Sequence, residues 1–114
     1  MTKYLIPVLL LISSPALAID RSYLGAWARE PGNCDFSGAG PFRITAKGIE
    51  GHEFDCTTKH ATPDGGGWLV QLSCAGEGDT YNLTLRWKIL PNGHLRETTK
   101  GKVVEYMRCA KAPK

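Results

Sequence analysis

The chain has 114 residues, and its 14 lysines and arginines against 11 aspartates and glutamates give a formal net charge of +3. This length suits one small domain and excludes a large hydrophobic core, so the fold needs a further source of stability. The longest uninterrupted apolar run, residues 4–12, excludes a permanent membrane-spanning helix, which needs roughly 20 apolar residues.

The first 18 residues follow the order of a secretory signal peptide. Lys3 supplies a positive charge, the apolar run follows, and Ala16 and Ala18 offer the small side chains at which signal peptidase cleaves. We therefore expect residues 1–18 to be removed, although an uncleaved anchor is the alternative. The prediction is a periplasmic or secreted protein with no stable membrane anchor and one mature domain over residues 19–114.

Four cysteines are present, at Cys34, Cys56, Cys74 and Cys109. An even number of cysteines in a small exported chain indicates disulfides. The sequence contains no Cys-x-x-Cys pair, which is the usual local unit of a structural zinc site. We therefore predict two disulfides, no metal site, no cofactor and no cysteine nucleophile, because a bridged sulfur offers no thiolate.

Alternation of apolar and polar residues predicts a mostly β structure. The clearest strand covers residues 81–89, where every odd position is apolar and every even position is polar. No segment of ten or more residues has a helical period. In chain order, strands are expected over residues 23–28, 42–46, 53–57, 68–74, 81–89, 94–99 and 103–109. The predicted fold is a small all-β antiparallel barrel or closed sandwich of about seven short strands.

Turn-forming residues separate these strands and suggest which cysteines pair. Residues 62–65 (Thr-Pro-Asp-Gly) and 90–93 (Leu-Pro-Asn-Gly) each combine a proline with a glycine, as short hairpin loops do. If the strands around Cys56 and Cys74 pair antiparallel about a turn at residues 64–66, the midpoint of the two cysteines, residue 65, lies inside that turn and the two thiols face each other. Four cysteines allow three pairings. This register selects Cys56 with Cys74, and it leaves Cys34 with Cys109.

Residues able to perform catalysis or bind metal are few, and we predict no enzyme. On a predicted strand, His52 and Glu53 point to opposite faces, so a shared metal would require other elements to converge. His60 and His94 are expected at strand ends or turns, in solvent. Glu53 and Asp55 share a strand face and could approach each other, but 96 mature residues leave little room for a catalytic groove.

The carboxyl-terminal part is basic, which raises the question of nucleic-acid binding. From residue 86 to the end there are eight basic and two acidic residues, together with Trp87 and Tyr106. Trp87, however, belongs to the apolar face of its strand, and Arg86 belongs to the opposite face. We therefore expect Trp87 in the core and no nucleic-acid partner.

Two resemblances follow from the residues. The tripeptide Gly25-Ala26-Trp27, with Arg108 near the end of the last strand, looks like the Gly-x-Trp and closing arginine of lipocalin-type barrels. The mature chain is shorter than a lipocalin, so we expect no large internal ligand cavity. The mature pattern is also similar to small uncharacterised four-cysteine periplasmic proteins of alphaproteobacteria, a likeness that implies a periplasmic location and transfers no catalytic residue. It rests on Gly25, Trp27, Cys34, residues 44–51, Cys56, Gly67, Trp68, residues 74–78 and residues 106–109.

The sequence leaves several functions open. The first hypothesis is a non-enzymatic module that binds a periplasmic or host protein, for example an inhibitor of a lysozyme or protease. A rigid scaffold with glycine-rich loops favours it, and so does the acidic part 19–85, with nine acidic and five basic residues. The chain lacks the loop motif of known periplasmic lysozyme inhibitors. The alternatives are a small barrel that binds a small ligand or, through His52 and His60, a metal, and a structural envelope protein. The oligomeric state stays open.

Overall fold

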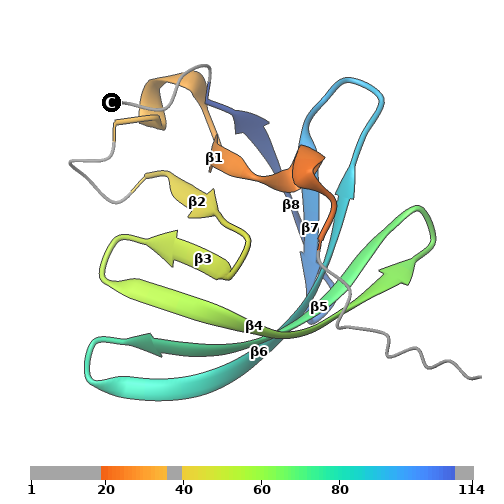
Figure 1. Ribbon diagram of the computed structural model, residues 1–114. Helices are drawn as coiled ribbons and strands as arrows, with labels where there is room; N and C mark the ends of the chain where they lie inside the picture. Colours follow the sequence, from red (N-terminus) through yellow and green to blue (C-terminus); the bar gives the residue numbers. More distant parts are fainter. Residues whose placement is uncertain (1–18, 36–39, 110–114) are drawn as a thin grey trace, which may run out of the picture.

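The computed structural model describes residues 19–35 and 40–109, so the predicted signal peptide lies outside the described residues. Eight antiparallel strands pair in chain order, and the barrel closes because β1 pairs with both β2 and β8 (Figure 1). The strands are β1 (Gly25–Ala28), β2 (Phe42–Ile44), β3 (Gly48–Gly51), β4 (Phe54–Asp64), β5 (Gly67–Gly76), β6 (Asp79–Ile89), β7 (Leu95–Thr99) and β8 (Lys102–Arg108). Two 3-10 turns, η1 (Arg21–Tyr23) and η2 (Pro31–Asn33), flank β1. The described residues contain no helix that is long and apolar enough to span a membrane.

The predicted all-β class is confirmed, and the strand that the sequence did not reveal is β3. Its four residues are bounded by glycines, so the alternation of Ile49 and Glu50 alone was too short to predict a strand. Ile49 nevertheless pairs with Ile44 of β2 on one side and with Cys56 of β4 on the other. Glycine is required at position 48 because a Cβ there would collide with the carbonyl oxygen of Cys56.

The first predicted strand begins later than expected. Residue 23 belongs to η1, because the Asp20 side chain accepts a hydrogen bond from the Ser22 amide and the Asp20 carbonyl accepts one from the Tyr23 amide. These local bonds hold the backbone in a 3-10 turn, so β1 starts only at Gly25.

The hairpin that joins β4 and β5 is longer than predicted. Pro63 and Asp64 belong to β4, and the turn itself consists of Gly65 and Gly66, which both have positive φ. The hairpin loop expected over residues 62–65 therefore begins too early, because a pair of adjacent glycines suits a two-residue turn better than the proline does. The turn over residues 64–66, from which the cysteine pairing was predicted, contains both turn glycines. The register around the cysteines is still the predicted one, since a bulge between Thr58 and His60 absorbs the shift.

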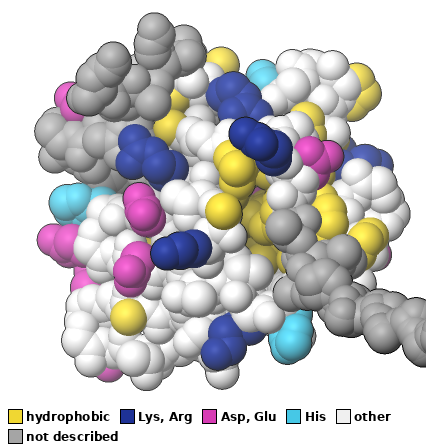
Figure 2. Space-filling view, in the orientation of Figure 1, with side chains coloured by type: hydrophobic (Ala, Val, Ile, Leu, Met, Phe, Trp, Pro, Cys, Tyr) yellow, Lys and Arg dark blue, Asp and Glu magenta, His cyan; other side chains and the backbone are white. Residues whose placement is uncertain are grey.

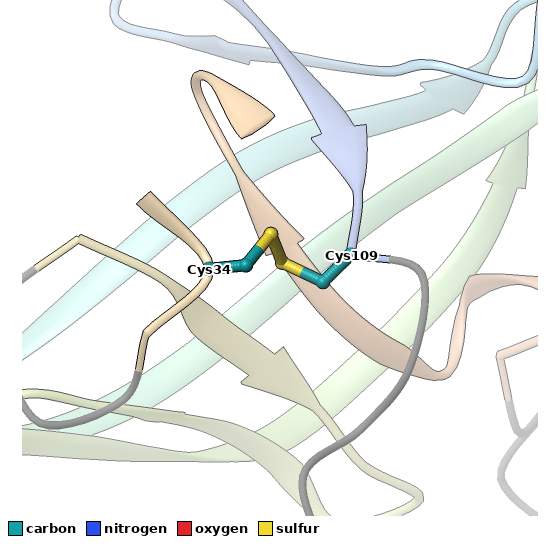
Figure 3. Close-up of a disulfide and its surroundings, with 2 residues drawn as sticks. All are labelled: Cys34 and Cys109. Atoms are coloured by element: carbon teal, nitrogen blue, oxygen red, sulfur yellow. A yellow bond between two sulfur atoms is a disulfide. The ribbon is translucent and has the colours of Figure 1, made fainter. Parts of the chain in front are cut away.

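Both predicted disulfides are present, and they lie on opposite sides of the barrel wall. Cys56 and Cys74 are direct cross-strand partners in β4 and β5, and their bridge belongs to the interior core. The bridge between Cys34 and Cys109 lies on the outer face of β1, where it packs with Ala26 and Ala28 (Figure 3). The second bridge thus fastens the segment after β1 to the residue after β8.

One end of the barrel, which we call the closed end, is filled by aromatic side chains. Tyr23, Trp27 and Trp87 are all buried there, and the Tyr23 and Trp87 rings stack with centroids 6.5 Å apart. The Trp27 indole N–H donates to the Tyr23 carbonyl at 3.0 Å, and the Tyr23 hydroxyl accepts from the Ile89 amide at 3.3 Å.

Arg108 fixes this closed end from outside. Its guanidinium carbon lies 4.2 Å from the centroid of the Trp27 ring. The same guanidinium donates to the backbone carbonyls of Ser22 and Leu24, which flank Tyr23. The residues that suggested the lipocalin-type pattern are therefore in contact, and together they tie η1 to the last strand.

The opposite end, which we call the open end, is staggered. β3 pairs only with the first four residues of β4, and β7 pairs only with the last four residues of β6. The β5–β6 hairpin consequently extends beyond β7 at this end, and the β4–β5 hairpin extends beyond β3 at the other end. Figure 1 shows β4, β5 and β6 as the longest, strongly curved strands. The turns that join β3 to β4, β5 to β6 and β7 to β8 all lie at this end.

Candidate functional site

A half-open cavity of about 110 Å³ lies inside the barrel at the open end. Five of its lining residues are apolar, and only Glu97 and the hydroxyl of Tyr106 bring polar side-chain atoms to its wall. The Phe42 and Tyr106 rings meet edge to face with centroids 4.8 Å apart. The complete lining is Phe42, Ile49, Phe54, Leu83, Leu85, Glu97 and Tyr106.

Glu97 places a carboxylate on the apolar side of β7. It follows the buried Leu95 by two residues, so the two side chains share the inward face. The indole N–H of Trp87, its direct partner on β6, donates to Oε1 of Glu97 at 2.9 Å. The hydroxyl of Tyr106 on β8 donates to the same carboxylate. Three neighbouring strands thus converge on one acidic group at the wall of the cavity.

Burial controls the protonation of this group. Loss of solvation raises the pKa of Glu97 above its ordinary value of 4.5, and the hydrogen bonds from Trp87 and Tyr106 offset part of that rise. Burial also raises the pKa of Tyr106 to about 12, and the negative charge of Glu97 adds to that shift. Tyr106 is therefore neutral at physiological pH and acts as a hydrogen-bond donor to the carboxylate.

A second, shallower hollow of about 350 Å³ adjoins the cavity, and Phe54 lines both. It lies between the β3–β4 and β5–β6 turns. Its lining is acidic and aromatic: His52, Glu53, Phe54, Gly76, Glu77, Asp79 and Tyr81. Figure 2 shows acidic side chains and a histidine gathered on the side of the molecule where Figure 1 places the β3–β4 turn.

The structure corrects the prediction for His52 and Glu53. These residues were expected on opposite faces of one strand, but Glu53 lies in the β3–β4 turn with φ 64°, and β4 begins only at Phe54. The turn brings His52 Nε2 within 3.5 Å of Glu53 Oε2. The strand spacing on which the predicted approach of Glu53 and Asp55 rested is therefore also wrong.

The three histidines lie at separate places. His52 is at the open end and His94 follows the β6–β7 turn. His60 is exposed, as expected, but it lies inside β4 beside the bulge and not at a strand end, because β4 is longer than predicted. His94 Nδ1 lies 2.7 Å from Oε2 of Glu105, and this hydrogen bond lowers the pKa of Glu105. Within the described ranges, no group of three or more histidine, cysteine or acidic side chains is positioned to hold a metal.

The basic residues near Trp87 behave as the alternation predicted. Trp87 is 1% exposed and belongs to the core, whereas Arg86 is exposed and forms an ion pair with Asp64 at 2.7 Å. Lys88 and Arg96 face each other across β6 and β7 on the same outer surface. These side chains line a hollow of about 240 Å³. Because the Trp87 ring is buried, it offers no exposed face on which a nucleic-acid base could stack.

No sequence motif singled out Glu97, and Tyr106 stood out as an aromatic neighbour of basic residues and as part of the four-cysteine resemblance. The signal for Glu97 was present in the predicted strand 94–99, where it occupies the same face as Leu95. A charged residue in an apolar row is an exception to the alternating pattern. Its partners come from β6 and β8, so only the register of the sheet reveals the cluster.

Comparison with protein-family models, with curated proteins and with solved structures finds no match to this chain.

Proposed function

We propose that this protein is a non-enzymatic binding module of the periplasm or of the secreted fraction, and that its open end holds a small ligand. Two disulfides in a small domain are typical of an oxidising compartment outside the cytosol. Of the hypotheses drawn from the sequence, the geometry favours the small-ligand barrel. The described histidines do not converge, so the geometry does not favour a metal-binding barrel.

The observation that carries this proposal is the contrast between the apolar wall of the cavity and its one polar cluster. Binding sites for small molecules are concave and mostly apolar, with a few polar groups that orient the ligand. The cavity at Glu97 and Tyr106 has this composition, and it is partly open to solvent. The volume of about 110 Å³ suits a ligand group of about five to seven non-hydrogen atoms, since a cavity of about 150 Å³ holds benzene.

Amide chemical-shift mapping tests this function directly. The oxidised protein, labelled with nitrogen-15, is titrated with small neutral and charged organic probes of about this size. We expect at least one probe to shift the amides of the lining residues Phe42, Leu83 and Tyr106 and to saturate. If no probe saturates, or if shifts scatter over the surface, the cavity is not a binding site.

A cavity-filling variant makes the test specific. Leu83→Phe adds volume to the lining and should abolish saturable binding, because Leu83 is only partly buried and the larger ring can turn into the cavity. Val103→Phe is the matched control, since Val103 is 59% exposed and does not line the cavity. Equal loss of binding in both variants would contradict the proposed location.

A second candidate is a partner protein, as the sequence first suggested. The observation in its favour is the hollow of about 350 Å³ beside the cavity, where Glu53, Glu77 and Asp79 surround Tyr81. Tyr81 is 44% exposed, and exposed tyrosines with a charged rim are frequent in protein interfaces. Acidic side chains there favour a basic partner, which is consistent with inhibition of a lysozyme.

Lysozyme inhibition is tested by mixing the protein with c-type lysozyme. The expected results are slower lysis of bacterial cell walls and a complex on size-exclusion chromatography. Undiminished lysis without a complex would remove this version. Tyr81→Ala should weaken the complex, and Val103→Ala, which changes another exposed apolar residue, should leave it unchanged.

A further inference from the structure

We propose that the open-end cavity selects small primary amines, with the ammonium group on Glu97 and the apolar body against Phe42 and Leu83. This inference rests on the proposed function, because it names the ligand class for the same cavity. It depends on three observations: the acceptor capacity of the carboxylate, its lack of a counter-charge and the composition of the remaining wall.

The first observation is that the carboxylate of Glu97 has acceptor sites to spare. A carboxylate offers about four lone-pair positions. The indole of Trp87 and the hydroxyl of Tyr106 each donate one hydrogen bond to it. Glu97 also lines the cavity, so its unused acceptor sites are available to a donor that enters there.

The second observation is that no described cation neutralises this carboxylate. None of the ion pairs formed by the described residues includes Glu97. Arg29, the one arginine that acts electrostatically on the cluster, affects Tyr106. Burial raises the pKa of Glu97, which means that its anion is poorly solvated. An entering ammonium supplies both the counter-charge and the hydrogen-bond donors that solvent does not.

The third observation concerns the rest of the wall. The other lining residues are aliphatic or aromatic, so they favour an alkyl or aryl body and give an anionic group no partner. Beside the cavity, Glu53, Glu77 and Asp79 add negative charge in the hollow that shares Phe54 with it. Charge of one sign around an entrance raises the local concentration of ligands of the opposite sign.

The test compares three probes with the same four-carbon chain: butylammonium, 1-butanol and butyrate. The complete, oxidised protein is titrated at pH 7 and low salt, and amide shifts of the cavity lining are followed. We expect butylammonium to bind with a dissociation constant on the order of 1 mM, a weak affinity that suits so few ligand atoms. 1-Butanol should bind at least tenfold more weakly, and butyrate should not bind.

The outcomes separate this inference from the function on which it rests. If 1-butanol or butyrate binds as tightly as butylammonium, the cavity binds small ligands but does not select amines, and the inference is overturned alone. If none of the three probes binds, the inference fails, and the proposed function fails with it when the wider set of neutral and charged probes also gives no saturable binding.

Glu97→Gln tests the assigned residue. Glutamine keeps an oxygen that accepts from Trp87 and Tyr106, but it removes the charge, so butylammonium should bind at least tenfold more weakly while 1-butanol is unaffected. Glu105→Gln is the matched control, because Glu105 is an exposed carboxylate on β8 that pairs with His94. Unchanged butylammonium binding in Glu97→Gln would contradict the assignment. Should that variant not fold, Leu83→Phe must abolish butylammonium binding for the proposal to stand.

A lysine side chain presents the same ammonium on a four-carbon chain, so one further probe is needed. Nα-acetyl-lysine methylamide carries this side chain on a short peptide backbone. Binding no tighter than that of butylammonium supports a free small amine. Binding that is clearly tighter would overturn that choice and assign the cavity to a lysine of a partner protein.

Discussion

The two ends of the barrel use similar aromatic side chains for different results. At the closed end, the polar atoms of Tyr23 and Trp27 bond to the backbone around them, and the rings fill the interior. Toward the open end, the hydroxyl of Tyr106 donates to a carboxylate at the wall of a cavity, and the indole N–H of Trp87 reaches the same carboxylate from the closed end. The comparison shows that the partners of the polar atoms, more than the aromatic content, distinguish the filled end from the end that keeps a cavity.

The largest expected effect is the loss of the aromatic filling at the closed end. Trp27→Ala should lower the free energy of unfolding by about 3 to 5 kcal/mol, because it removes a fully buried indole and leaves a void. Phe42, its direct cross-strand partner toward the open end, is only partly buried, so Phe42→Ala should cost about 1 to 2 kcal/mol. Urea denaturation measures both losses, and equal values would contradict the division into two ends.

Removal of the outer disulfide should have the next largest effect. Cys34 and Cys109 are 75 residues apart in sequence, and the loop-entropy model gives such a bridge up to about 4 to 5 kcal/mol of stabilisation. We expect the double substitution to alanine to lower the free energy of unfolding, measured in urea, by about 2 to 4 kcal/mol. Alanine is nearly as small as cysteine, so the loss reports the missing cross-link and not a new void. A loss below about 1 kcal/mol would show that β1 and β8 stay paired without this fastening.

Arg108→Ala should have a smaller effect, confined to the closed end. The substitution removes two hydrogen bonds to backbone carbonyls and the contact with the Trp27 ring, and should cost about 1 to 3 kcal/mol. Arg86→Ala is the control, since the exposed ion pair of Arg86 with Asp64 is worth less than about 1 kcal/mol. If Arg86→Ala lowers the free energy of unfolding as much as Arg108→Ala does, the contacts of Arg108 with Trp27 and the backbone add no stability beyond that of an exposed ion pair.

The smallest effect is a change in how stability depends on pH. The pKa of Glu97 is raised in the folded state, so its protonated form contributes to folding stability. That contribution to stability is complete below the ordinary pKa of 4.5 and is lost as the pH rises through the raised pKa. Glu97→Gln should therefore stabilise the ligand-free protein at pH 7 but not below pH 4.5. The pKa of Glu105 is lowered in the folded state, so its ionised form contributes to folding stability. That contribution is present above pH 4.5 and is lost as the pH falls through the lowered pKa. Thermal unfolding between pH 3 and 8 should show opposite trends for Glu97→Gln and Glu105→Gln, and parallel trends would contradict the assigned burial of Glu97.

Much of the fold was predictable, because alternation and cysteine spacing are local or pairwise signals. The inward row of the strand over residues 81–89 and the pairing of Cys56 with Cys74 follow from two-residue periodicity and one hairpin. β3 was not predictable from its own residues, because a strand of four residues that begins and ends with glycine shows too little alternation. Its stability comes from pairing on both sides, which is a property of the assembled sheet.

Less of the candidate site could be predicted. The carboxylate of Glu97 acquires its environment from Trp87, ten residues earlier, and from Tyr106 on the following strand. The spacing along the chain does not show that Trp87 and Tyr106 contact Glu97; only the register between β6, β7 and β8 does. The one local signal, an acidic residue in the inward row of a strand, indicates that something is unusual but not what it contacts.

The overhang of β4 and β6 has a consequence for self-association. In the described part of the chain, no strand pairs with the far side of β4 beyond Thr57 or with the far side of β6 before Arg86. The β4 overhang carries a bulge and Pro63, devices that discourage a further strand from docking. The stretch from Thr80 to Leu85 has neither proline nor charge, so partly unfolded protein should aggregate through it. Thr84→Lys should reduce light scattering on heating, and equal scattering would exclude this edge as the route.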